Sequence, residues 1–251
     1  GAALLLSFNN TPVAAATINV DGNDVVVLAN SSCSLPEAIQ NADKGYAYFD
    51  DCAAGTPGPD TIVLSPFSHF VLSTKYADYA DSPTALPAIY SDITFEGNAA
   101  TIERASGAPQ FRLMAVLSTG KVTLNDLVLK NGDSIAAGGA IHSVGTLTLN
   151  SSVVSGNTAA GGGGGIYSDG PLTLNASTIS ANKAGKGAGL LLESGQVLIN
   201  GSSISTNEAT GFGGGMSVTY AGVTISNTSI VSNNKALDGG GIDNAYGSVT
   251  I

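Results

Sequence analysis

The chain has 251 residues, of which 19 are acidic and 9 are basic, so its formal net charge is −10. Such an acidic protein is repelled by phosphate groups, which argues against nucleic acid and anionic membrane surfaces as partners. Residues 17–120 carry 12 acidic and 4 basic side chains (−8), whereas residues 121–251 carry 7 and 5 (−2). No stretch of the sequence is apolar for long enough to predict a transmembrane segment.

Residues 1–16 are predicted to be the remnant of a signal peptide. They are mostly apolar and end in Ala14-Ala-Ala16, a pattern typical of the rear of a secretory signal with cleavage after Ala16. We therefore expect the protein to be secreted or displayed at the cell surface. At the other end, Ser248–Ile251 falls within a predicted strand. We therefore expect a fragment of a longer protein, truncated at its C-terminus.

Residues 17–57 are predicted to form an amino-terminal cap and contain both cysteines, Cys33 and Cys52. In an exported chain the two are expected to form a disulfide, and the alternative is a pair of buried free thiols. The two histidines, His69 and His142, lie far apart in the sequence. The sequence therefore predicts no metal site and no cofactor.

Residues 58–251 are predicted to form a solenoid, with regular turns from about residue 121. A glycine motif ending in an aliphatic residue or Met returns every 24 to 26 residues, from Gly-Gly-Ala-Ile141 to Gly-Gly-Gly-Ile242. Within each repeat, three short runs of alternating apolar and small polar residues predict three strands. Fixed-period similarity of this length indicates stacked turns of a parallel β-helix, in which inward aliphatic residues such as Leu149 and Leu174 stack from turn to turn.

A second series in phase with the glycines places an asparagine just after an inward aliphatic residue. Asparagine tolerates left-handed backbone angles, and its amide can hydrogen-bond its equivalents in the turns above and below. We therefore predict a structural ladder at a bend of the chain, formed by Asn125, Asn150, Asn175 and Asn200. The glycines are interpreted as tight corners in the same way.

Asp169 and Glu193 are weak candidates for a catalytic pair. Each lies three residues after the aliphatic residue of its glycine motif, so the two are expected to stack on neighbouring turns roughly 5 Å apart, the separation of carboxylates in retaining glycosidases. Both also fall in predicted turns, where acidic residues are common. No catalytic residue is therefore assigned from the sequence.

An outward series of threonines follows the same period. Its members are Thr123, Thr148, Thr173, Thr224 and Thr250, interrupted by Leu198. A single column of threonine on a flat sheet is explained by ordinary β-propensity better than by a match to ice.

The segment Cys33-Ser-Leu-Pro-Glu37-Ala-Ile-Gln-Asn-Ala-Asp43 resembles the bacterial family named for its Cys-Ser-Leu-Arg-Glu-Ala motif, with Pro36 in place of arginine. The likeness continues through Gly58–Leu64 and Leu86–Ile102 into the glycine repeats, which are also similar to those of polymorphic outer-membrane proteins. It implies a right-handed parallel β-helix of the pectin-lyase-like type, exposed at the cell surface. It also implies a short capping helix over residues 36–43, since proline fits the first turn of a helix.

The preferred functional hypothesis is a non-enzymatic surface passenger, acting as an adhesin or a structural protein with surface glycans or a host-cell surface as partner. The resemblance implies anchoring in the outer membrane by a carboxy-terminal element outside this chain. The alternative is a polysaccharide lyase or glycoside hydrolase, with its site outside this chain or in the excursion Tyr76-Ala-Asp78-Tyr79-Ala-Asp81.

Overall fold

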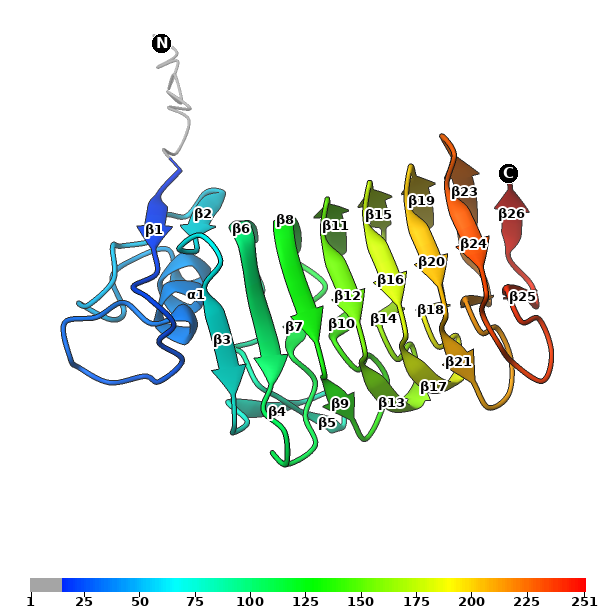
Figure 1. Ribbon diagram of the computed structural model, residues 1–251. Helices are drawn as coiled ribbons and strands as arrows, with labels where there is room; N and C mark the ends of the chain where they lie inside the picture. The colour runs from blue at the N-terminus through cyan, green and yellow to red at the C-terminus, as the bar shows by residue number, and fades with distance from the viewer. Residues whose placement is uncertain (1–14) are drawn as a thin grey trace, which may run out of the picture.

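The computed structural model describes residues 15–251 and shows a right-handed parallel β-helix, closed at its amino-terminal end by one α-helix (Figure 1). This confirms the predicted fold class. The predicted signal-peptide remnant lies outside the described residues except for its last two. Of these, Ala16 accepts a backbone hydrogen bond from Thr61 over 2.8 Å and so joins the first turn.

The first face of the β-helix is a row of parallel strands joined in register from turn to turn. Its members are β1 (Thr17–Asn19), β2 (Asp60–Val63), the first halves of β6 (Asp92–Arg104) and β8 (Lys121–Lys130), then β11 (Thr146–Asn150), β15 (Leu172–Asn175), β19 (Gln196–Asn200), β23 (Gly222–Ser226) and β26 (Ser248–Thr250).

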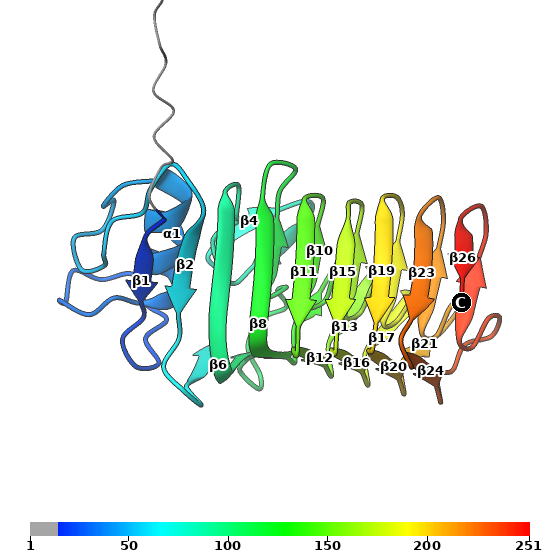
Figure 2. The ribbon, with the colours of Figure 1, turned by 90° about the horizontal axis from the view of Figure 1, so that it is seen from above.

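The second face continues the same sheet around a bend, so that β6 and β8 contribute to both faces (Figure 2). It is built from β3 (His69–Leu72), the second halves of β6 and β8, β12 (Val153–Ser155), β16 (Thr178–Ser180), β20 (Ser203–Ser205) and β24 (Ile230–Ser232).

The third face is a separate parallel sheet made of one short strand per turn. In spatial order it holds β7 (Met114–Val116), β10 (Ile141–Ser143), β14 (Ile166–Ser168), β18 (Leu190–Leu192), β22 (Met216–Val218) and β25 (Ile242–Asn244).

Two smaller sheets complete the strand inventory. The corner between the second and third faces carries β9 (Asp133–Ser134), β13 (Thr158–Gly162), β17 (Lys183–Lys186) and β21 (Glu208–Ala209). An antiparallel hairpin, β4 (Ala77–Tyr79) and β5 (Ser82–Thr84), occupies the excursion that precedes β6.

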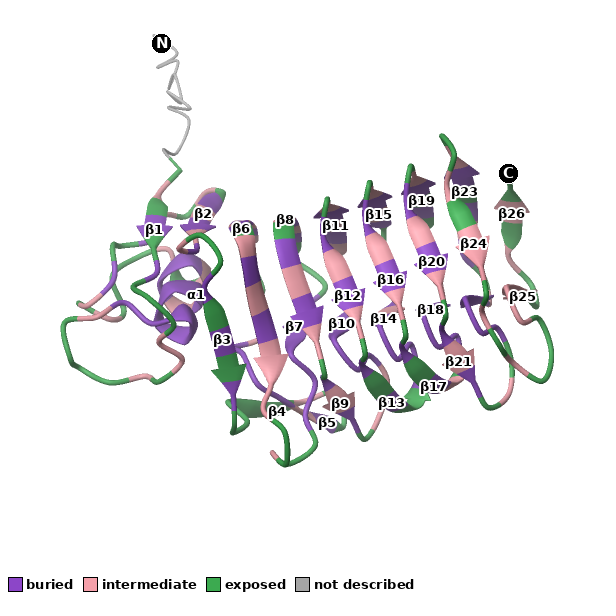
Figure 3. Cartoon of the chain, viewed as in Figure 1, coloured by how far each residue is buried: buried purple, intermediate pink, exposed green. Residues whose placement is uncertain are grey.

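The core is the interior of the coil, and it is filled by the ladders that the period predicts. Leu149 lies opposite Leu174, Leu174 opposite Ile199, and all three are fully buried. Because each turn covers the apolar side chains of the next, burial alternates along most strands of the first two faces, as the banding in Figure 3 shows. From β8 onward the strands of the first two faces pair in continuous register, whereas the pairing of β6 with β8 is interrupted between Glu96 and Ala100.

The predicted asparagine ladder lies at the bend between the first and second faces. Each side-chain amide donates to the side-chain oxygen one turn earlier over 2.5–3.1 Å, in the pairs Asn150–Asn125, Asn175–Asn150, Asn200–Asn175 and Asn227–Asn200. The left-handed backbone angle expected at Asn125, Asn150, Asn175 and Asn200 falls instead on the residue after each, with φ of 47–57° at Asp126, Ser151, Ala176 and Gly201. Asn150, Asn175 and Asn200 end their strands and Asn125 lies within β8, and in all four turns the bend begins one residue later.

A second asparagine ladder lies inside the coil and runs in the opposite direction. The Nδ2 amide of Asn157 donates to Asn182 Oδ1 in the next turn over 3.0 Å, and Asn182 donates in the same way to Asn207. These side chains are fully buried, and each also donates to a backbone carbonyl and accepts from a backbone amide, as Asn157 does from Gly132. Buried amides with every partner present stabilise the register between turns.

Helix α1 (Leu35–Lys44) covers the amino-terminal end of the core, which confirms the predicted capping helix with one more residue at each end. Ser34 is its N-cap and forms a capping box with Glu37, whose Oε2 accepts from the Ser34 amide over 2.9 Å. Pro36 occupies the first turn, where its missing amide hydrogen costs nothing. Glu37 Oε1 also accepts from the amide of Leu28 over 3.1 Å, so one buried carboxylate joins the helix to the loop before it.

The remainder of the cap is held by the predicted disulfide and by a buried asparagine. Cys33 and Cys52 are bonded, with their Cα atoms 4.7 Å apart, which excludes the free-thiol alternative. Asn41 donates to the carbonyl oxygens of Phe49 and Ala53 over 2.9 and 3.0 Å and accepts from two backbone amides. The cap is continuous with the β-helix, because β1 pairs with β2 as the first strand of face one.

Candidate functional site

The structure places Asp169 and Glu193 at equivalent positions of adjacent turns on the third face. They follow β14 and β18, whose register pairs Ser168 with Leu192. Asp169 is exposed, and its Oδ1 accepts a hydrogen bond from Ser194 over 2.6 Å. Glu193 is partly buried, and its Oε1 lies 3.4 Å from Lys186 Nζ. Asp169 is therefore held by a serine of the next turn, and Glu193 by a lysine of β17 (Lys183–Lys186), the strand before β18.

Beside this pair, the third face carries an aromatic cluster that the repeat pattern does not reveal. The rings of His142 and Tyr167, from adjacent turns, are stacked with centroids 4.6 Å apart. Tyr79, from the β4–β5 hairpin, packs edge-on against His142 with centroids 6.0 Å apart. The hairpin thus covers the start of the third face, and His142 is only 9% exposed.

Arg112 fixes the β4–β5 hairpin by hydrogen bonds to its backbone. Its side chain is fully buried, and the guanidinium donates to the carbonyl oxygens of Tyr79 over 2.9 Å and Ala80 over 3.3 Å. Ala80 and Asp81 form the tip of the hairpin with φ of 46° and 60°, left-handed values that are unfavourable for residues other than glycine. Arg112 therefore satisfies the carbonyls of a strained turn, a role for which the sequence contains no periodic signal.

Burial controls the protonation of this cluster. It lowers the pKa of His142 to about 4, with a further contribution from the Arg112 charge, so the imidazole is neutral at pH 7. Burial also lowers the pKa of Arg112, to about 10, which leaves it protonated at pH 7. The pKa of Tyr167 is raised by burial and by the negative charges of Asp169 and Glu193. An imidazole with such a low pKa is a weak general base at neutral pH.

A polar hollow of about 390 Å³ lies at the end of β6 and is also lined by residues of the next two turns. Its charged groups pair with each other or with the flanking His69 and Lys130. Glu103 lies 2.7 Å from His69 Nε2 and 3.0 Å from Lys130 Nζ, and Arg104 lies 3.7 Å from Asp133. Burial alone would raise the pKa of Glu103, but hydrogen bonds from Lys130 and His69 outweigh it and lower that pKa. The cluster is thus a surface ion-pair network.

The outward threonines form a longer column than the repeats predict. Three further members precede Thr123 on the first face, so that the column contains, in order, Thr17, Thr61, Thr94, Thr123, Thr148, Thr173, Leu198, Thr224 and Thr250. The earlier three lie outside the 25-residue period, because the loops between them are longer. The column lies on a flat sheet beside the asparagine ladder, where β-branched residues pack well.

Within residues 15–251, no group of three or more histidine, cysteine, aspartate or glutamate side chains is arranged to hold a metal ion. In the same part of the chain, none of the helices has the length and apolar character needed to cross a membrane.

Comparison of the chain with models of protein families, with curated proteins and with solved structures finds no match in any of the three. The resemblance to the family of the Cys-Ser-Leu-Arg-Glu-Ala motif therefore stays a prediction from the motif residues. The structure does assign roles to three of those residues: Glu37 and Asn41 hold the cap, and Asp43 Oδ1 accepts from the amides of Tyr90 and Ser91 over 2.6 and 2.9 Å.

Proposed function

We propose that this chain is a non-enzymatic secreted or cell-surface β-helix that acts as an adhesin or structural protein, with surface glycans as its partners. The observation that carries the proposal is that three charged groups on or beside the third face already have partners within the fold. Asp169 accepts a hydrogen bond from Ser194, and Glu193 forms an ion pair with Lys186. The guanidinium of Arg112 donates hydrogen bonds to backbone carbonyl oxygens. Groups that are already satisfied within the fold are poorly placed for acid–base chemistry on a substrate.

Secretion or surface display is supported by the disulfide between Cys33 and Cys52, because such bonds persist in oxidising compartments. It is also supported by the exterior of the regular turns. Their outward positions carry mostly threonine, serine and asparagine, and the net charge of residues 121–251 is only −2. A long, nearly neutral surface rich in hydroxyls suits contact with carbohydrate or solvent.

The alternative, a polysaccharide lyase or glycoside hydrolase, is favoured by one observation, the adjacency of Asp169 and Glu193 beside Tyr167. A single experiment separates the two functions. The purified chain is incubated with insoluble polysaccharides and with bacterial and host cell surfaces. Retained protein, released reducing ends and unsaturated uronides are then measured.

We expect retention without product. Release of reducing ends or unsaturated uronides that is lost in the double variant Asp169→Asn, Glu193→Gln would contradict the proposal and establish the enzyme. Neither retention nor product on any of these surfaces would overturn the adhesin function.

A further inference from the structure

We propose that a hollow between the amino-terminal cap and the chain leading into β4 binds a neutral pyranose sugar, as one unit of a glycan. The inference rests on the proposed function, and it gives the glycan partner a site and a chemical class. Its walls come from the segment that leads into the tyrosine-rich excursion, ending at Tyr76, and from the loop before α1, two segments that the repeats do not explain.

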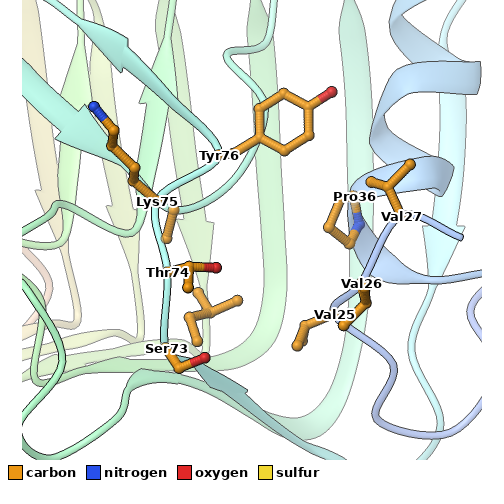
Figure 4. Close-up of a pocket in the computed structure, with 10 residues that line it drawn as sticks. Val25, Val26, Val27, Pro36, Ser73, Thr74, Lys75 and Tyr76 are labelled. Carbon is orange, nitrogen blue, oxygen red and sulfur yellow. The ribbon is translucent and has the colours of Figure 1, made fainter.

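The hollow has a volume of about 260 Å³ and two unlike walls (Figure 4). One wall is apolar and consists of Val25–Val27 and Pro36. The other is the segment Ser73–Tyr76, where the hydroxyls of Ser73 and Thr74 point across the hollow and the Tyr76 ring stands between the two walls. Leu72 and Ala85, both buried, also line it.

A second hollow of about 210 Å³ adjoins the first, and Tyr76 lines both. The second hollow lies between α1 and the hairpin and adds two further tyrosines, Tyr79 and Tyr90. Its polar and charged groups are Gln40, Asp43, Lys44 and Asp78. Five of the eight tyrosines of the chain fall in residues 46–90. The groove therefore continues past Tyr76 toward two further aromatic rings, those of Tyr79 and Tyr90.

The two walls match the two sides of a pyranose. Such a ring has apolar C–H faces and a rim of hydroxyl groups, so it needs an apolar or aromatic surface together with hydrogen-bonding groups at its edge. Val26 is 50% exposed and Tyr76 is 40% exposed, so apolar area faces water on both sides of an open hollow. A bound sugar would cover that area and exchange hydrogen bonds with Ser73 and Thr74.

The charge distribution selects a neutral sugar over an anionic one. Lys75 is the charged residue that lines the first hollow, and its Nζ is paired with Asp78 Oδ2 at 2.5 Å. The surrounding residues 17–120 carry a net charge of −8, which repels uronic acids and sulfated sugars.

The test uses the full chain on an array of neutral and uronic-acid oligosaccharides, followed by calorimetric titration with the neutral oligosaccharide that binds best. Three variants are compared with the wild type: Tyr76→Ala, Val26→Asp on the opposite wall, and Tyr220→Ala as the control. Tyr220 is a matched control because it is 69% exposed and lies at the far end of the β-helix. All three positions are exposed, so their melting temperatures should stay close to that of the wild type.

We expect the chain to bind neutral oligosaccharides. Tyr76→Ala removes the aromatic contact and Val26→Asp places a charge on the apolar wall, so each should weaken the affinity about tenfold or more. Tyr220→Ala should leave the affinity unchanged. Neutral binding that survives both groove substitutions would overturn the site but leave the adhesin function standing. A preference for uronic acids, or no binding to the array, would overturn the inference. The adhesin function would then be judged separately by retention on cell surfaces.

Discussion

The side-chain amide of Asn125 donates a hydrogen bond to Glu96 Oε1 over 2.8 Å, so the external asparagine ladder ends on a carboxylate. Every amide from Asn227 to Asn150 points its donor toward the amino terminus, and the last donor needs an acceptor that does not itself require one. Glu96 meets this need because an ionised carboxylate only accepts. The charge-assisted bond is also stronger than an amide–amide bond.

The ladder predicts a graded response to substitution. Asn150→Ala removes one donated and one accepted hydrogen bond and should lower the free energy of unfolding by about 1–3 kcal/mol. Glu96→Ala removes one bond and should cost about 1–2 kcal/mol, whereas Glu96→Gln keeps an acceptor for Asn125 and should cost less than about 1 kcal/mol. Urea denaturation measures all three. Equal losses for the two Glu96 variants would show that the acceptor is unimportant.

The capping box should be the main contact between α1 and the preceding loop. Glu37 is fully buried and accepts from two backbone amides, so Glu37→Ala leaves both unsatisfied and should cost about 2–4 kcal/mol. Ser34→Ala removes the reciprocal bond, a longer one of 3.4 Å, and should cost about 1 kcal/mol. Thermal unfolding followed by circular dichroism measures both variants. If Ser34→Ala were the more damaging, the second role of Glu37 at Leu28 would be contradicted.

Arg112 should control the docking of the hairpin. Arg112→Met keeps much of the buried volume but leaves the carbonyls of Tyr79 and Ala80 without their donor, and it should destabilise the fold by about 2–4 kcal/mol. Hydrogen exchange should rise first in residues 77–84 and the rings around His142 should loosen, while exchange in β15 and β19 stays slow. A uniform rise along the β-helix would contradict a local role.

Stability should fall as the pH drops through the range set by His142. Its pKa is about 4 in the fold and 6.5 in the unfolded chain, so between these values the unfolded state binds the proton and the folded state does not. The contribution of the neutral His142 to the free energy of unfolding is fully present above pH 6.5. It declines as the pH falls toward 4, by about 3 kcal/mol in total. His142→Phe should abolish this part of the pH dependence in urea titrations. An unchanged slope in that variant would assign the effect to other groups.

The disulfide should raise the free energy of unfolding, because it restricts the conformations of the unfolded chain. The two cysteines are 19 residues apart, and closing a loop of this size is worth about 3 kcal/mol in the chain-entropy model. The double variant Cys33→Ser, Cys52→Ser should therefore melt at a lower temperature, with the loss concentrated in the cap. The single variant Cys33→Ser should be no more stable than the double. Melting temperatures unaffected by reductant in the wild type would show that the bond does not form.

The candidate catalytic pair shows which contacts the sequence period predicts and which it does not. Equal spacing along the sequence places residues at equivalent positions of successive turns, so the adjacency of Asp169 and Glu193 followed from the repeats. Their partners did not: Ser194 lies in the corner of the next turn, and Lys186 comes from β17, an element that the strand pattern left unassigned. A side chain's partner depends on the local path of the loop, which the period does not specify.

The sequence by itself determined the β-helix, its register and its inward ladders, because in a solenoid of equal turns the sequence period is the structural period. It also predicted the capping helix, from its motif residues, and a disulfide, for which it left a pair of free thiols as an alternative that the structure excludes. Only the tertiary structure decided that Tyr79 packs on His142, that Arg112 supports the hairpin, and that Glu96, Thr61 and Thr94 extend the ladders. These residues lie in turns of unequal length, where contacts join segments separated by irregular loops and no repeat encodes which side chains meet.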